Sequence, residues 1–167
     1  MKLEAKYRLQ AKTLTPLTKE SSGAYVSVMP DAQGLQTLAN IAVALGVVAA
    51  PDELHCTLSY AKGCTTKAVA NPNLRFGAKI KGIEYWDGHD NDGYLVVMLY
   101  SSDLKNRNRY WTACGLKHSF HDYTPHTTLV SKIEKTPELL TLMGRVGRYV
   151  TGQLITFTNG TLEGLKP

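Results

Sequence analysis

The sequence is poor in the features that mark secreted and membrane-spanning proteins. It has three cysteines, Cys56, Cys64 and Cys114, an odd number without C-x-x-C spacing, so we expect reduced thiols rather than a disulfide framework. Its longest apolar run, residues 41–51, falls short of the ~18 residues that a membrane span needs. The N-terminus is charged where a signal peptide would be apolar. We therefore expect a soluble cytoplasmic protein that does not bind membranes.

Extended disorder and low-complexity structure are also disfavoured by the composition. Of the 167 residues, 43% are hydrophobic and 20% are charged, values typical of one globular domain. Lys and Arg (19) exceed Asp and Glu (14), and the resulting net charge of +5 suits a partner that carries phosphate. We expect a polar, basic N-terminal arm over residues 1–22 and a single bilobal domain over residues 23–167.

Hydrophobic periodicity predicts an α+β fold. Turn residues separate the predicted elements, and Ser102 and Asp103 are expected to cap the second helix. The last residues, 162–167, are expected to form a tail. The predicted strands are residues 24–29, 55–60, 74–86, 94–100, 126–130 and 153–158, and the predicted helices are residues 35–45, 104–114 and 138–149.

The order strand, helix, loop, strand occurs twice along the chain. Tyr25 precedes His55 by 30 positions in the first half, and Tyr94 precedes His126 by 32 positions in the second. This internal repeat of about 70 residues, over residues 24–86 and 93–158, is longer than solenoid periods. It predicts two pseudo-symmetric lobes of antiparallel sheet with outer helices and a cleft between them.

Both halves carry the motif H-x-T-L on a predicted strand, as His55-Cys56-Thr57-Leu58 and His126-Thr127-Thr128-Leu129. Residues two apart on a strand point to the same face, so each His and its Thr are expected to project together into the cleft. Alternatively, the two histidines are half-buried strand residues that bond the backbone. The duplicated setting favours the cleft.

Two imidazoles in one cleft suit phosphodiester chemistry without a metal. A neutral His can accept a proton from the attacking hydroxyl or water, and a protonated His can give one to the departing alkoxide. The hydroxyls of Thr57 and Thr128 can donate hydrogen bonds to the charged phosphate oxygens. The sequence does not decide which histidine is the base.

Paired H-x-T motifs in a duplicated α+β chain resemble the 2H phosphoesterase superfamily, whose members cleave 2',3'-cyclic phosphates or 2',5'- and 3',5'-linked oligonucleotides. Within it, the Gly-Ala-Tyr-Val-Ser-Val start and the phrase Asp-Glu-Leu-His-Cys-Thr-Leu-Ser-Tyr over residues 52–60 look most like the bacteriophage anti-CBASS nucleases. Those nucleases destroy the cyclic di- and trinucleotide signals of bacterial immunity. The resemblance implies opening of substrates such as 3',3'-cGAMP and cyclic tri-adenylate, in the host cytoplasm if a phage encodes the chain. The resemblance implies that the reaction needs no metal or other cofactor. It also implies that the catalytic residues are His55, Thr57, His126 and Thr128.

The resemblance also suggests substrate-binding residues. Tyr25 and Trp86 lie near the family's aromatic positions and are expected to pack against nucleobases, which stack on aromatic rings with little sequence preference. Core packing is the alternative for both. Family members use an acidic residue near the C-terminus; Glu163 is the nearest candidate, although Gly160 stands where a Glu was expected. Lys62 and Lys132 follow the two motifs and could attract phosphates.

Three other functions remain open from the sequence. One alternative is a metal site, because the spacing of Cys114, His118, His121 and Asp122 resembles that of metal ligands. The second Cys or His pair of a structural zinc site is absent, so we expect no bound metal. The same fold could act on an RNA end with a 2',3'-cyclic phosphate. A third possibility is a nucleotide- or RNA-binding module without catalysis, which two intact His-Thr pairs disfavour.

Overall fold

A computed structural model describes residues 14–49, 53–89, 92–120 and 122–167. These residues contain three helices and seven strands, and every strand pairing is antiparallel. The α+β class is therefore confirmed. In chain order the elements are β1 (Leu14–Thr15), β2 (Gly23–Pro30), α1 (Ala32–Ala44), β3 (Cys56–Lys62), β4 (Arg75–Asp87), β5 (Asp92–Tyr100), α2 (Ser102–Ala113), β6 (His126–Glu134), α3 (Pro137–Val150) and β7 (Leu154–Leu165).

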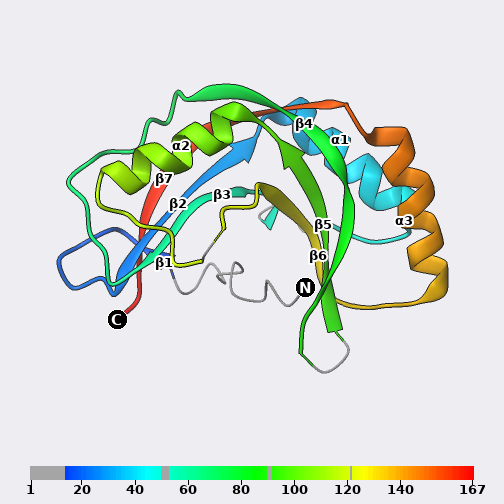
Figure 1. Ribbon diagram of the computed structural model, residues 1–167, viewed down its shortest axis with the longest axis horizontal. Coiled ribbons are helices and arrows are strands. Elements are labelled where there is room, and N and C mark those ends of the chain that lie inside the picture. Colours follow the sequence, from blue (N-terminus) through cyan, green and yellow to red (C-terminus); the bar gives the residue numbers. More distant parts are fainter. Residues whose placement is uncertain (1–13, 50–52, 90–91, 121) are drawn as a thin grey trace.

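The strands form one strongly curved sheet that closes on itself. Their order is β1-β7-β2-β3-β6-β5-β4, and β4 also pairs with the first half of β7 through residues 154–158. Figure 1 shows the resulting arch, with β2, β3 and β7 on one side and β4, β5 and β6 on the other. The two sides meet where β3 lies beside β6, and there the register pairs Cys56 with Thr127.

Each helix begins at a side chain that caps its first turn. Asp31, Ser101 and Thr136 accept hydrogen bonds from the third backbone N–H that follows, which satisfies one of the donors left unpaired at a helix start. The cap of α2 is thus Ser101, and the prediction of Ser102 and Asp103 was wrong by one residue. Ser101 directly follows the strand predicted over residues 94–100, and its extended backbone allows its hydroxyl to accept the hydrogen bond from the N–H of Leu104.

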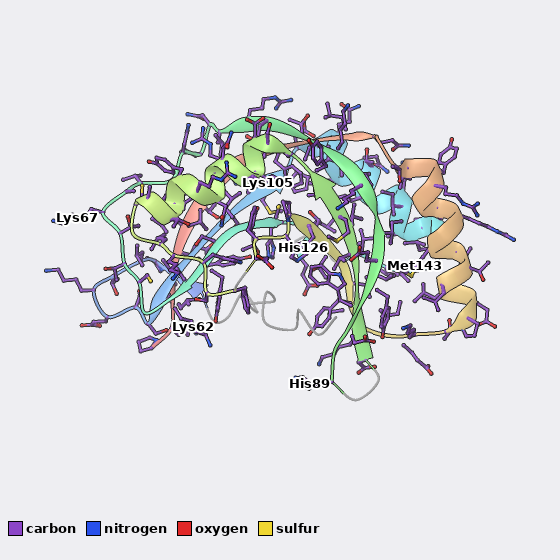
Figure 2. All side chains as sticks on the ribbon, viewed as in Figure 1. Lys62, Lys67, His89, Lys105, His126 and Met143 are labelled. Carbon is purple, nitrogen blue, oxygen red and sulfur yellow. The ribbon has the colours of Figure 1, made fainter. Side chains whose placement is uncertain are left out.

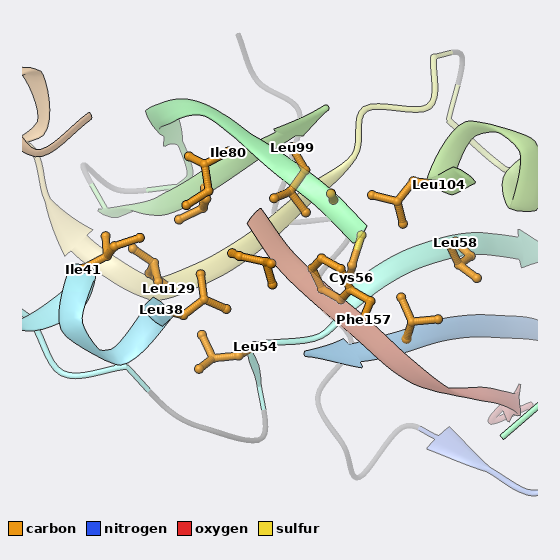
Figure 3. Packing of buried hydrophobic residues seen from close by; sticks show 14 of the residues in the cluster. Leu38, Ile41, Leu54, Cys56, Leu58, Ile80, Leu99, Leu104, Leu129 and Phe157 are labelled. Carbon is orange, nitrogen blue, oxygen red and sulfur yellow. The ribbon is translucent and has the colours of Figure 1, made fainter. Parts of the chain in front are cut away.

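The main hydrophobic core joins all three helices to both sides of the sheet. It includes Leu38 from α1, Leu104 from α2 and Leu139 from α3, together with strand residues such as Cys56 and Phe157. Figure 3 shows Leu38 and Leu104 with Cys56 and Phe157 among the buried side chains of this core. Because one core supports both sides of the arch, the position of β3 relative to β6 is fixed by packing as well as by pairing.

Two predictions from the sequence need comment. The tail expected at residues 162–167 was wrong, because β7 continues to Leu165 and pairs with β2 up to Ala24. The predicted arm lies largely outside the described residues, but its last part contains β1, which pairs with residues 164–165. Among the described helices, none is long and apolar enough to cross a membrane.

Candidate active site

The two H-x-T motifs lie side by side. The pairing of Cys56 with Thr127 places the β3 and β6 motifs antiparallel, so by register Thr57 lies across from His126, and His55 across from Thr128. Facing residues of an antiparallel pair project to the same side of the sheet, and alternate residues share that side. Cys56 packs into the main core on the other side. The structure therefore brings the four predicted catalytic side chains to one face.

The leucine of each motif marks a β-bulge. In β3 the register steps from Ser59 opposite Val26 to Thr57 opposite Ser27, so that Leu58 is the extra residue. In β6 it steps in the same way from Val130 to Thr128, and Leu129 is the extra residue. Both leucines are buried in the core. In each H-x-T-L motif, the His and the Thr thus lie on the face of the candidate site, and the Leu packs into the core at the bulge.

The side chain of His126 is held in place and buried from solvent. Its Nδ1 lies 2.8 Å from the carbonyl oxygen of Thr124, and its ring centre lies 4.4 Å from that of Trp86. The side chain is 6% exposed, and burial lowers the pKa of His126 from 6.5 to about 4, against the opposing effect of the Thr124 carbonyl. Because a carbonyl oxygen only accepts, Nδ1 carries the proton and Nε2 keeps its lone pair.

Thr57 is also fixed, through two tyrosines. Its Oγ1 lies 2.8 Å from the phenol oxygen of Tyr25, and the phenol of Tyr123 donates to its backbone carbonyl at 2.8 Å. Burial raises the pKa of Tyr25, so that phenol stays protonated at neutral pH. With Tyr25 as donor, the hydroxyl proton of Thr57 is available to another acceptor.

His55 and Thr128 are the more open pair of the face. Both side chains are partly exposed, whereas Thr57 is 5% exposed. The ring of His55 meets that of Tyr25 edge to face, with 5.8 Å between the ring centres. Tyr25 therefore contacts one motif twice, by its ring at His55 and by its hydroxyl at Thr57.

The predicted substrate-binding residues all lie near this face, but in different ways. Tyr25 and Trp86 are 1% and 2% exposed, and each packs against one of the two histidines. Glu163 is paired in register with Tyr25, and its charge contributes to the raised pKa of that phenol. A Glu could not replace Gly160, because a Cβ there would lie 2.7 Å from the carbonyl oxygen of Asn71.

Sequence reasoning missed the segment that leads into β6. His118, Phe120 and Tyr123 all lie against β3 or the aromatic side chains of the site, and the nearest signal was the density of His and aromatic residues just before the second motif. Nδ1 of His118 accepts the backbone N–H of Tyr60 at 3.0 Å, and burial lowers the pKa of His118 to about 4.

The alternative of a metal site gains no support from this segment. Nδ1 of His118 is already engaged by Tyr60, and His121 lies outside the described residues. Within the described part of the chain, no three His, Cys, Asp or Glu side chains are grouped to hold an ion.

The fold is thus a closed antiparallel sheet with helices, in which two adjacent strands carry the H-x-T motifs. Two imidazoles on one face of a sheet can serve acid–base chemistry. A sequence profile described as Anti-CBASS protein Acb1 matches residues 22–140. The chain therefore belongs to the Anti-CBASS protein Acb1 family.

Several phage proteins named Anti-CBASS protein Acb1 are similar to the chain. That of Yersinia phage phiR1-RT is 35% identical over 78 residues, which cover 47% of this chain and 50% of the relative. Those of Salmonella phage S16 and Vibrio phage KVP40 are 31% and 28% identical over 112 residues, covering 65% and 66% of this chain and 72% and 73% of the relatives. The chain thus spans about half the length of the first relative and more of the other two.

Proposed function

We propose that the protein is a phosphodiesterase that opens 3',5'-linked cyclic di- and trinucleotide immune signals without a metal, and so lets a phage evade CBASS defence. The observation that carries the proposal is the pairing of Cys56 with Thr127, which aligns both H-x-T motifs on one face. Membership of the Anti-CBASS protein Acb1 family supports the biological role. The protein acts in the cytoplasm of the host cell, where such signals are made.

His126 is the general base. Its low pKa of about 4 keeps the imidazole neutral at pH 7, and the bond from Nδ1 to Thr124 leaves Nε2 as the proton acceptor. Nε2 takes the proton of a ribose 2'-hydroxyl or of a water as that oxygen forms a bond to phosphorus. The bond from phosphorus to the 5'-oxygen breaks.

His55 is the general acid. It gives a proton to the departing 5'-oxygen, so that one proton enters His126 and one leaves His55 in each opening. His55 is partly exposed, so solvent can return its proton after each turnover, whereas the buried His126 is sheltered from competing donors. The product is a linear oligonucleotide that ends in a 2',3'-cyclic phosphate or, after attack by water, in a phosphate.

The threonines stabilise the phosphate. Negative charge grows on its non-bridging oxygens in the transition state, and pre-oriented donors stabilise that charge without reorganisation. Thr57 is oriented by the Tyr25 phenol, and Thr128 lies on the same face of β6 as His126. Tyr25 therefore acts through Thr57 and is a positioning residue.

The test is incubation of the protein with 3',3'-cGAMP, cyclic tri-adenylate and an RNA oligomer ending in a 2',3'-cyclic phosphate, all in EDTA, with products read by mass spectrometry. We expect linear products from the cyclic nucleotides and none from the double variant His55→Ala, His126→Ala. Turnover of the RNA end alone would reassign the protein to RNA processing. No turnover of any of the three would contradict the proposal.

A further inference from the structure

One edge of β3 pairs with β2, and the other edge contacts β6 only at Cys56 and is otherwise bordered by residues 116–120 and 122–123. Leu116, His118, Ser119 and Tyr123 hold this segment to β3 through hydrogen bonds at both of its ends. Ser119 bonds twice: its N–H donates to the carbonyl of Tyr60 at 2.8 Å, and its Oγ accepts from the N–H of Lys62 at 2.9 Å. The described part of the segment is thus fixed on the strand that carries His55 and Thr57.

Phe120 lies at the centre of the aromatic residues that these bonds bring to the site. Its ring stacks on that of Tyr60, with 5.6 Å between centres and 22° between planes, and meets the edge of His118 at 5.4 Å. It packs against two separate apolar clusters, one containing Tyr25 and the other containing Trp86. Since Tyr25 contacts His55 and Trp86 contacts His126, Phe120 reaches the surroundings of both imidazoles.

Tyr25 and Trp86 have almost no surface left for a ligand, at 1% and 2% exposure, whereas Phe120 is partly exposed. A phosphodiester between the two imidazoles has a nucleoside on each side, and a base gains binding energy by stacking on an aromatic ring. Lys62, whose Nζ lies 5.9 Å from the centre of the Tyr60 ring, adds a positive charge near the residue on which Phe120 stacks.

We propose that Phe120 forms the nucleobase-binding surface of the site. This inference rests on the proposed function for the identity of the ligand. Tyr25 and Trp86 then hold the histidines, and Phe120 makes the contact with the base. The chemical class of the ligand is a purine base attached to the phosphodiester under attack.

The test separates binding from turnover. Phe120→Leu keeps an apolar side chain but removes the ring face, Phe120→Trp enlarges that face, and Tyr110→Leu is a matched control at an exposed aromatic of α2. For each variant we would measure the Kd of a non-hydrolysable phosphorothioate 3',3'-cyclic dinucleotide by calorimetry, kcat and KM with 3',3'-cGAMP and cyclic tri-adenylate, and the midpoint of thermal unfolding.

We expect Phe120→Leu to weaken binding by about 5- to 150-fold and to raise the KM of both substrates, with a smaller change in kcat. Phe120→Trp should bind at least as tightly as the wild type, and Tyr110→Leu should be unchanged. Unchanged Kd in Phe120→Leu, or a loss of stability and kcat with Kd unchanged, would overturn the inference. If the wild type binds the phosphorothioate but opens neither cyclic nucleotide, the proposed function fails, and the Kd of Phe120→Leu still tests the inference.

Discussion

The same four-residue motif occurs in two opposite environments. In β3 the threonine is fixed, because Thr57 is buried and bonded to Tyr25, while its histidine, His55, is partly exposed. In β6 the histidine is fixed, because His126 is buried between Trp86 and the Thr124 carbonyl, while Thr128 is partly exposed. Antiparallel pairing places the two buried side chains, Thr57 and His126, across from each other, and it places the two partly exposed side chains, His55 and Thr128, across from each other.

Under the proposed function, this difference gives the two copies of one motif different chemical roles. One acid and one base with the same side chain need environments that favour different protonation states. Burial on the β6 side favours neutral imidazole at His126, whereas His55 on the β3 side is partly exposed to solvent. The buried hydroxyl of Thr57 lies across from His126 in the register.

The largest expected effect is loss of either histidine. We expect His126→Ala and His55→Ala each to lower kcat/KM by about 10²- to 10⁴-fold, since each removes one proton transfer. Initial rates with 3',3'-cGAMP measure the effect. His89→Ala, in the hairpin after β4 and far from His126 in Figure 2, is the matched control and should keep full activity. Wild-type rates in either motif variant would exclude a two-histidine mechanism.

The bulge leucines should contribute similarly on the two sides. Leu58→Ala and Leu129→Ala each remove a buried side chain from the common core, and we expect each to reduce the free energy of unfolding by about 2–5 kcal/mol. Urea unfolding followed by circular dichroism gives the values. Leu140→Ala, at a position 43% exposed on α3, should change stability far less. A large cost at only one of the two leucines would show that the bulges differ in energetic role.

The different environments of Thr57 and Thr128 predict smaller losses of kcat than the histidine variants, and a larger loss at Thr57 than at Thr128. Thr57→Val should lower kcat by about 100-fold, because a pre-oriented donor to the phosphate is lost, and Thr57→Ser should retain most activity. Tyr25→Phe removes the bond that orients this hydroxyl, and we expect about a tenfold loss in kcat with little change in KM. Thr128→Val tests whether the open partner contributes less. Equal losses at Thr57 and Thr128 would argue against the asymmetry.

The pH dependence of kcat/KM reports the base directly. A base must be neutral, so the loss of activity on the acidic side should occur as the pH drops through about 4, the pKa of His126, and not through 6.5. Trp86→Ala admits water to the imidazole and should move this acidic limb upward toward 6.5. Initial rates between about pH 3.5 and 8 measure it. A wild-type limb at 6.5, or a decline as the pH rises through 4, would reverse the assignment of base and acid.

Stability has to be followed over the same range. Unfolding returns the pKa of His118 and His126 to about 6.5, so below this pH the unfolded chain binds more protons than the folded one. Folding stability is therefore fully present above pH 6.5 and decreases as the pH falls toward 4. Circular dichroism at each pH distinguishes loss of folded protein from loss of the base.

Local patterns in the sequence predicted the strands and the motif pair well, because a strand with a repeated H-x-T-L carries its own signal. The α+β class, the helices and the likeness to phage anti-CBASS proteins were confirmed. The predicted tail was wrong because residues 159–164 contain Asn159, Gly160 and Gly164, which are typical of turns, whereas pairing with β2 extends the strand. The roles of His118, Phe120 and Tyr123 depend on contacts with β3, more than 50 residues away, and no local pattern reveals such contacts.

The strand β7 has a consequence for how the protein assembles. It pairs with both β2 and β4. The side-chain hydrogen bond between Ser27 and Thr161 joins β2 to β7 across 134 positions of the sequence. Until β7 is in place, both of those strands present a free edge, which is a template for pairing with another chain. Closure of so long a loop is slow. We therefore expect a variant that weakens β7 to expose these edges and to reduce the yield of folded protein before it reduces activity.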